Sequence, residues 1–154
     1  MIGRIGAMAV SIVVTMGCIA ASCFAADPAA ASPRSRTHDE FVANIPAFPY
    51  QADATRGQKI RVGVTALQHC MTAAQVVALL GEPDFTYVAF REGTKDVPQM
   101  NILTYVLAQQ SERERETDQR VIVWMGMPDE LRAVSVWGVH GLTGLEGSAG
   151  MRCH

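Results

Sequence analysis

The sequence predicts an α+β fold of two layers, with one or two short helices packed on an antiparallel meander sheet of three to four strands. Residues 71–84 have apolar positions at helical spacing and a capping signal at each end. After residue 84, apolar residues alternate with period two in successive segments separated by short turns. Strands joined in this way pair antiparallel, and a helix that covers one face buries their apolar side chains. A chain of 154 residues is expected to hold one such domain.

The first 25 residues have the composition of a secretory signal peptide. Arg4 is the only charged residue before Asp27, and the stretch between them is apolar and ends in small residues. A basic start, an apolar middle and a small-residue end predict export with cleavage after Ala25. Residues 26–36 are rich in Ala, Pro and Ser, so we expect them to form a flexible leader.

Two alternatives to a cleaved signal peptide stay open. The uncharged run from Ile5 to Ala26 is long enough to span a bilayer uncut. Cys23 follows the small residues Ala21 and Ser22, as a lipidated cysteine does, although the Leu that usually stands three residues earlier is missing. Lipidation at Cys23 would anchor the chain stably to a membrane through two acyl chains.

The charge balance argues against nucleic acid as a partner. The chain has 13 basic and 15 acidic residues, and removal of Arg4 with the signal peptide leaves 12 against 15. The basic residues form no stripe of the kind that nucleic-acid-binding surfaces use. Export from the cytoplasm would also separate the chain from nucleic acid.

Residues 37–59 predict an irregular lead-in that contains at most a short helix. Thr37 and Glu40 have the spacing of a capping box, and Pro46 would end that helix early. In residues 59–67 the apolar residues alternate imperfectly, so the pattern allows either a strand or a short helix.

The clearest predicted helix begins at Thr72. This residue is a good N-cap, and Gln75 three residues later completes a capping box. Met71 and Val76 have the spacing of a hydrophobic staple across the same turn. The apolar face of the helix comprises Val76, Val77, Leu79 and Leu80.

Gly81 and Pro83 mark the end of this helix and the start of the sheet. Gly81 suits the left-handed position after the last turn, and Pro83 keeps the helix from resuming. The strands predicted after Pro83 comprise residues 85–90, 101–108, 120–127 and 131–139. The strand residues expected to face the helix, or else their alternates, are Val88, Phe90, Ile102, Tyr105, Val121, Val123, Val134 and Val136.

The connections between these strands are polar or glycine-rich. Residues 111–119 contain six charged residues and predict a solvent-exposed hairpin loop. In the last strand, strict alternation places Leu131 on the face opposite Val134 and Val136. Residues 140–154 continue a series of glycines at every third position, and we expect a flexible tail there.

Cys70 and Cys153 are the cysteines that remain after signal removal. In an oxidising compartment such a pair is a disulfide candidate, and the bridge would tie the C-terminus to the start of the predicted helix. Two unpaired thiols are the alternative. His69 and His154 flank these cysteines, but adjacent residues rarely bind one zinc ion together and the usual spacing of zinc ligands is missing. We therefore expect no metal and no cofactor.

The chain contains no catalytic motif that we recognise. It lacks a nucleophile elbow, a zinc-protease helix, a P-loop and a dinucleotide-binding fingerprint. His140 has no evident carboxylate partner, and the neighbouring acids Asp129 and Glu130 are expected to be solvated in a turn. We therefore expect no catalytic residues.

The predicted helix also carries the motif of a known family. The chain resembles the BamE-like (SmpA/OmlA) domain family, whose motif is G-M-T-x-x-Q-V-x-x-L-L-G-x-P, over roughly residues 60–139. The matching residues are Met71, Thr72, Gln75, Val76, Leu79, Leu80, Gly81 and Pro83. Tyr105 matches a tyrosine on the family's second strand, and Cys70 stands where the family has the glycine before Met-Thr.

The resemblance implies both an architecture and a role. It implies two short helices, one of them over residues 59–67, on a three- or four-stranded antiparallel sheet, a shape also used by β-lactamase-inhibitor proteins. It further implies a non-enzymatic interaction domain in the periplasm or at the periplasmic face of the outer membrane. Its partners would be envelope proteins, such as the machinery that inserts β-barrel proteins into the outer membrane. An inhibitor-like binding protein, and a small thiol-dependent protein using Cys70, are the alternative functions.

Overall fold

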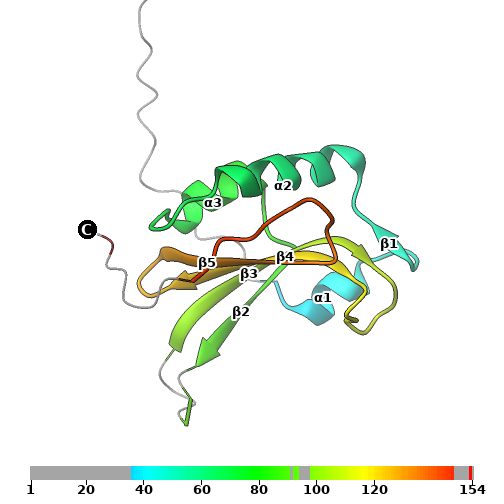
Figure 1. The fold of residues 1–154 in the computed structure, drawn as a ribbon. Helices are drawn as coiled ribbons and strands as arrows, with labels where there is room; N and C mark the ends of the chain where they lie inside the picture. The colour runs from blue at the N-terminus through cyan, green and yellow to red at the C-terminus, as the bar shows by residue number, and fades with distance from the viewer. Residues whose placement is uncertain (1–35, 91, 94–97, 148–152, 154) are drawn as a thin grey trace, which may run out of the picture.

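The protein has the predicted α+β class. A computed structural model describes residues 36–90, 92–93, 98–147 and 153. Within these residues, a five-stranded antiparallel sheet carries two helices on one face and a third helix on the other (Figure 1). The predicted signal peptide, the leader through residue 35 and the lipidation candidate Cys23 lie outside the described residues.

The first helix, α1 (His38–Ala43), begins at the predicted capping box. The Thr37 hydroxyl accepts a hydrogen bond from the Glu40 N–H, and the Glu40 carboxylate accepts one of 2.8 Å from the Thr37 N–H. These hydrogen bonds satisfy N–H groups that the first turn leaves free. The hydrogen bond from the Thr37 backbone N–H also lowers the pKa of Glu40, because it stabilises the charged carboxylate.

The second helix, α2 (Ala54–Ala66), begins earlier than the sequence suggested. Asp53 caps it by accepting a 2.9 Å hydrogen bond from the Arg56 N–H. The predicted boundary between lead-in and domain at residue 60 is therefore wrong, because α2 crosses it. The alternative of a strand over residues 59–67 is also wrong. The buried side of this helix, spaced at helical intervals, comprises Ile60, Val64 and Leu67.

The third helix, α3 (Ala73–Leu80), has the predicted caps at both ends. Thr72 and Gln75 exchange hydrogen bonds of 2.9 and 3.3 Å. Gly81 has a φ of 88° in the left-handed region, and its N–H donates to the Val77 carbonyl. The helix packs closely on α2, because a Cβ placed at Gly63 would lie only 2.6 Å from a methyl group of Leu80.

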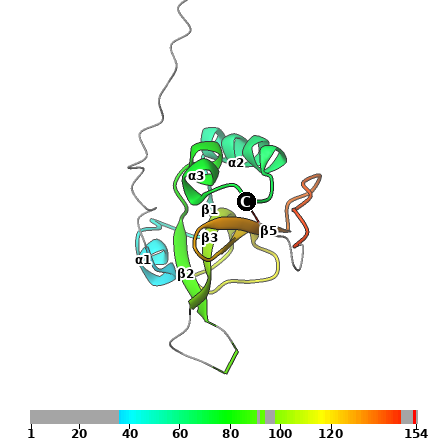
Figure 2. The ribbon, with the colours of Figure 1, turned by 90° about the vertical axis from the view of Figure 1, so that its left-hand side faces the viewer.

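The sheet is a meander whose strands pair in chain order. Its four longer strands are β2 (Phe85–Phe90), β3 (Pro98–Gln109), β4 (Gln119–Gly126) and β5 (Glu130–Trp137). A two-residue strand, β1 (Tyr50–Gln51), was not predicted. It pairs with the C-terminal end of β3, on residues that β2 does not reach. Figure 2 shows α2 and α3 together on one side of the sheet and α1 on the other side.

The main core lies between the sheet and the pair α2 and α3. Cross-strand partners share a face, so the register identifies the helix-facing side of the sheet. Its buried residues are Leu103, Tyr105, Leu107, Val121, Val123, Met125, Leu131 and Val134. Ile102 faces the opposite side of the sheet, so its alternate Leu103 takes the core position on β3. Val88 and Phe90 lie on β2 beyond the helices and stay exposed.

A β-bulge explains why strict alternation failed in β5. Trp124 pairs with Ala133, whereas the next residue of β4, Met125, pairs with Leu131. The extra residue in β5 shifts the register, so Leu131 shares the helix-facing side with Val134. Leu131 is held there by two backbone hydrogen bonds to residues 70 and 71.

The expectation of a flexible tail is wrong for residues 140–147, which pack against the fold together with residue 139. Leu145 exchanges two backbone hydrogen bonds, of 2.8 and 2.9 Å, with Val134 of β5. Val139 is buried, and Leu142 and Leu145 pack against the main core. A Cβ at Gly144 would lie 2.1 Å from the Val134 carbonyl oxygen, so only glycine allows this close approach. The small residues that suggested flexibility permit contact instead.

Candidate functional site

The face of the sheet opposite α2 and α3 carries two exposed aromatic side chains, those of Tyr87 and Trp137. Tyr87 pairs with Ile102, which pairs with Trp124, so these three residues of neighbouring strands lie in one row on this face. In the next rows are Ile122 with Ser135 and Arg120 with Trp137. We define the open face as Tyr87, Ile102, Arg120, Ile122, Trp124, Ser135 and Trp137.

The open face combines large exposed rings with smaller apolar residues that are buried. Tyr87 and Trp137 remain 46% and 47% exposed, while Trp124 is partly buried. Ile102 is 1% exposed and Ile122 9% exposed, and Tyr87 and Trp124 are the cross-strand partners of Ile102. The aromatic side chains therefore form the outer surface of the molecule here, where apolar area could be buried against another molecule.

Helix α1 closes one end of the open face. Phe41 of α1 packs with Phe85 of β2 and Val106 of β3 in a second, smaller core. The His38 ring meets Phe85 edge to face, with ring centroids 5.0 Å apart. These contacts leave the other end of the face, towards Tyr87 and the β2–β3 hairpin, outside the cover of α1.

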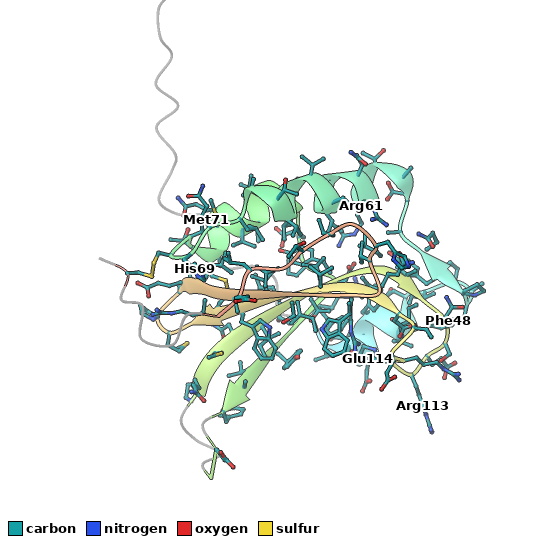
Figure 3. The ribbon with its side chains drawn as sticks, viewed as in Figure 1. Phe48, Arg61, His69, Met71, Arg113 and Glu114 are labelled. Carbon is teal, nitrogen blue, oxygen red and sulfur yellow. A yellow bond between two sulfur atoms is a disulfide. The ribbon has the colours of Figure 1, made fainter. Side chains whose placement is uncertain are left out.

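Charged residues border the open face beside α1. Arg120 of β4 forms an ion pair with Glu114 of the loop 110–118. The Arg120 guanidinium also lies 5.8 Å from the centroid of the Trp137 ring, within the range of a cation–π contact. The His38 Nε2 atom is 4.0 Å from a Glu114 carboxylate oxygen. Figure 3 shows Glu114 at the end of the molecule away from His69 and Met71.

The hairpin loop predicted over residues 111–119 covers residues 110–118 in the structure, and it is mostly exposed but internally braced. Residues 112–117 are exposed. Asp118 is 2% exposed, and its carboxylate accepts hydrogen bonds of 2.9 Å from the Gln110 N–H and 2.6 Å from the Arg115 N–H. These bonds close the loop on itself, so Glu114 is presented to Arg120 from an ordered turn.

A buried ion pair lies on the other side of the sheet. Asp84 accepts a hydrogen bond of 2.9 Å from the Arg56 guanidinium and one of 2.6 Å from the Val106 N–H. Burial raises the pKa of Asp84, because desolvation disfavours the carboxylate more than these partners stabilise it. Burial likewise raises the pKa of Tyr105. The pair connects α2, β2 and β3 from inside the fold.

The residues of the family-like motif belong to the helix layer rather than to the open face. Val76 and Leu80 are fully buried, and Met71 and Leu79 pack at the edge of the same core. Thr72 and Gln75 cap α3, Gly81 makes the turn after it, and Pro83 is buried. Within the structure these eight residues specify architecture.

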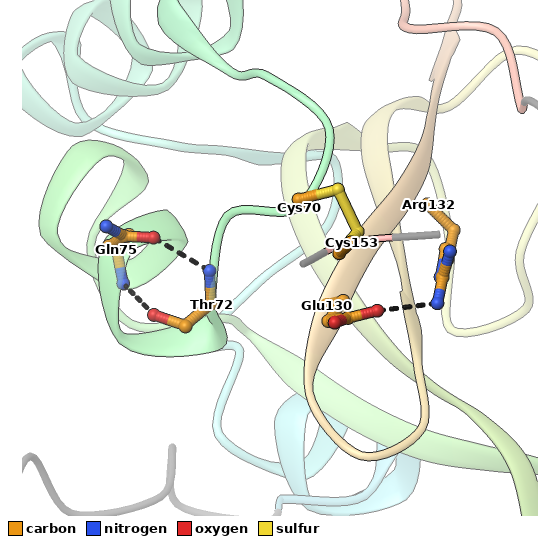
Figure 4. Close-up of a disulfide and its surroundings, with 6 residues drawn as sticks. All are labelled: Cys70, Thr72, Gln75, Glu130, Arg132 and Cys153. Carbon is orange, nitrogen blue, oxygen red and sulfur yellow. Dashed lines mark hydrogen bonds and ion pairs between the residues drawn. A yellow bond between two sulfur atoms is a disulfide. The ribbon is translucent and has the colours of Figure 1, made fainter. Parts of the chain in front are cut away.

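The structure brings Cys70 and Cys153 together. Their sulfur atoms are bonded, and their Cα atoms lie 5.4 Å apart across a sequence separation of 83 residues (Figure 4). Cys70 is the only described non-glycine residue with a positive φ, 68°. The bridge stands beside the capping box of α3 and beside an ion pair of β5. In that ion pair the Arg132 guanidinium lies 2.6 Å from a Glu130 carboxylate oxygen.

The remaining chemically interesting residues do not converge. Among the described residues there is no group of three His, Cys, Asp or Glu side chains that could hold a metal ion, and His154 lies outside them. The expectation that Asp129 is only solvated in a turn is wrong. Its carboxylate accepts a 3.2 Å hydrogen bond from the Ala73 N–H at the start of α3. This bond ties the β4–β5 turn to the helix.

Nothing in the sequence indicates directly that Tyr87, Trp124 and Trp137 form a surface. The pattern places each of them in a strand but does not say which face of the strand a helix covers. One signal was available. Trp137 and Tyr87 alternate with residues that could fill the core equally well, so both faces of these strands are apolar.

Comparisons with known proteins identify no relative. No protein-family model matches the chain, and no curated protein or solved structure is detectably similar to it. In the part of the chain that the structure describes, no helix has the length and apolar character needed to cross a membrane.

Proposed function

We propose that this chain is an exported, non-enzymatic interaction domain that binds envelope proteins through the open face. The observation that carries the proposal is the aromatic surface itself. Tyr87 and Trp137 are each close to half exposed on a rigid sheet, beside Arg120. Exposed aromatic and arginine side chains on a fixed surface are the usual anchors of protein interfaces.

Two observations support the exported location. The signal-like residues 1–25 predict secretion. The bond between Cys70 and Cys153 is of the kind that persists in oxidising compartments such as the periplasm. The resemblance of residues 60–139 to the BamE-like family adds the specific role, an accessory of outer-membrane protein assembly at the periplasmic face of the outer membrane. An inhibitor-like binder would use the same face.

Site-specific photocrosslinking tests the proposed surface. A photoreactive amino acid is placed at Tyr87 on the open face or at Val62 on the outer side of α2, which is 58% exposed and serves as the matched control. The full chain is expressed in a Gram-negative host, and adducts are identified by mass spectrometry. We expect adducts with outer-membrane assembly components at Tyr87 and none at Val62. Equal labelling at both positions would count against the open face.

Cell fractionation tests the location and the anchor. The wild-type chain is expected in the envelope fraction with Cys70 and Cys153 resistant to alkylation until they are reduced. Cys23→Ala separates the two export routes, since it should release a lipid-anchored protein into the periplasm and leave a secreted one unchanged. Recovery in the cytoplasm with freely alkylated cysteines would refute export.

A further inference from the structure

A groove runs along the outer edge of the sheet, next to the open face. It has a volume of about 510 Å³ and lies between β5 and the C-terminal segment, lined by residues 133–137 and 143–147. Volumes of this size are typical of sites that hold a ligand or a short peptide segment. The groove exists because Leu145 pairs with Val134 while the chain on either side of Leu145 is not paired as a strand.

The middle of the groove, which we call its floor, carries small side chains on the side of the open face. Val134 and Leu145 face the main core, so their neighbours along each segment face the other way. These neighbours are Ala133, Ser135, Gly144 and Glu146, of which the first three are small. Gly147 stands so close that a Cβ on it would lie 3.5 Å from the Ala133 Cβ. A floor without large side chains lets another backbone approach closely.

The two ends of the groove differ in chemistry. At one end stands Trp137 of β5. Its ring is contacted by the Arg120 guanidinium from the neighbouring strand β4, outside the groove. At the other end stands Glu146, the only charged residue that lines the groove. Glu146 is exposed, and none of the ion pairs among the described residues involves it. The groove is therefore apolar at one end and negatively charged at the other.

The register gives the spacing between these ends. Because Val134 lies opposite Leu145 in an antiparallel arrangement, Glu146 lies opposite Ala133. Trp137 is four residues further along β5, which corresponds to about 13 Å in extended chain. In an extended peptide, residues i and i+4 point to the same side and have this same separation.

We propose that the groove binds an extended segment of a partner protein that carries an apolar or aromatic residue and, four residues away, Arg or Lys. The apolar residue packs on Trp137, the basic side chain pairs with Glu146, and the peptide backbone lies on the small-residue floor. Ser135 adds a donor, since its Oγ already accepts the Trp124 indole N–H at 3.0 Å and its own proton is available. This inference rests on the proposed function and names the partner's chemistry.

An NMR titration with synthetic peptides tests the proposal on the folded, oxidised protein. The probe is acetyl-Phe-Ser-Thr-Ser-Arg-amide, compared with a peptide in which Glu replaces Arg and with one in which Arg directly follows Phe. The chain contains two tryptophans, so their indole N–H signals can be followed separately. We expect the first peptide to bind with at least threefold higher affinity than the other two and to shift the Trp137 signal.

Charge exchange provides the matched control. Glu146→Lys should reverse the preference in favour of the Glu peptide, whereas Glu116→Lys in the exposed loop 110–118 makes the same change in net charge away from the groove. Trp137→Ala should weaken binding of every peptide about tenfold. Equal effects of the two lysine variants, or an unchanged affinity in Trp137→Ala, would overturn the groove proposal. If photocrosslinking at Tyr87 still yields adducts but peptide binding is unaltered in Glu146→Lys and Trp137→Ala, the groove proposal is overturned. The open face would then remain the interface.

Discussion

Cys70 holds a backbone conformation that usually belongs to glycine. Its φ of 68° lies in the left-handed region, where a Cβ crowds the following carbonyl and costs about 1–2 kcal/mol. Its N–H donates to the Leu131 carbonyl at 3.0 Å, and its sulfur is bonded to Cys153. A glycine would adopt this conformation without that cost, whereas Cys70 is held in it by the hydrogen bond to Leu131 and by the disulfide.

The cost of this conformation can be measured apart from the disulfide. Two double variants, Cys70→Gly with Cys153→Ser and Cys70→Ser with Cys153→Ser, both lack the bridge and differ only at the strained position. We expect the glycine variant to be more stable by about 1 kcal/mol in urea-induced unfolding. Equal stabilities would mean that the turn relaxes once the bridge is gone.

Asp84 makes stability depend on pH in an unusual direction. Because burial raises its pKa, the folded protein takes up a proton at a higher pH than the unfolded chain does. Its contribution therefore favours folding in acid, and this contribution falls as pH rises from the ordinary Asp range, about 4, through the folded pKa. An ordinary paired surface carboxylate behaves in the opposite way.

The neutral variant Asp84→Asn isolates this contribution, because it keeps an oxygen that can accept the Val106 N–H but cannot ionise. We expect the unfolding free energy of the wild type, minus that of the variant, to increase as pH is lowered from 7 to 4. Asp39→Asn is the control, since the Asp39 side chain is fully exposed. A difference that decreases over the same range would show that the Arg56 pairing outweighs burial.

Among the elements, α2 and α3 depend on one small residue where they meet. A Cβ at Gly63 would lie 2.6 Å from the Leu80 Cδ2 and 2.8 Å from the Leu79 carbonyl oxygen. Backbone cannot yield as a flexible side chain can, so the helices would have to separate. The same helix contains Gly57, where the nearest atom to such a Cβ is Leu107 Cδ2 at an ordinary 3.8 Å.

These two glycines give a matched pair of substitutions. We expect Gly63→Ala to reduce the unfolding free energy by about 1–3 kcal/mol through overpacking. Gly57→Ala should instead raise it by about 0.5–1 kcal/mol, because alanine favours a helix interior. Chemical denaturation of both variants measures the contrast. Similar effects at both positions would contradict the close crossing.

The elements also show which parts of the fold the sequence could predict. The caps of α1 and α3 depend on residues three apart, such as Thr72 and Gln75, and were predicted correctly. The bulge at Leu131 depends on hydrogen bonds to residues 70 and 71, which are distant in sequence. The contact of Leu145 with β5 and the exposure of Trp137 likewise depend on the tertiary arrangement. The candidate site was therefore not predictable as a surface, although each residue in it was placed in the correct strand.

On the scale of the whole molecule, the disulfide closes the chain around the sheet. Cys70 precedes α3, and Cys153 follows the segment that pairs with β5, so the loop between them contains α3 and strands β2 to β5. The same bridge holds both ends of the structure that lines the groove: β5 through Leu131 and the C-terminal segment through Cys153. Stability and the shape of the groove are thus expected to depend on the same bond.

Cys153→Ser should therefore destabilise the protein and loosen its C-terminal segment. In the chain-entropy description, a closed loop of this size contributes about 4.5 kcal/mol by restricting the unfolded chain. We expect the free energy of unfolding, measured with urea at pH 7, to fall by this order. Hydrogen exchange should become faster at the amides of Val134 and Leu145 than at Val123 in the sheet centre, because the former two lie where the segment can detach. Wild type treated with a thiol reductant is the control and should match the variant within about 1 kcal/mol, since both lack the bridge. A variant as stable as the oxidised wild type, with Val134 and Leu145 still protected, would show that packing of Leu142 and Leu145 alone holds the segment against β5.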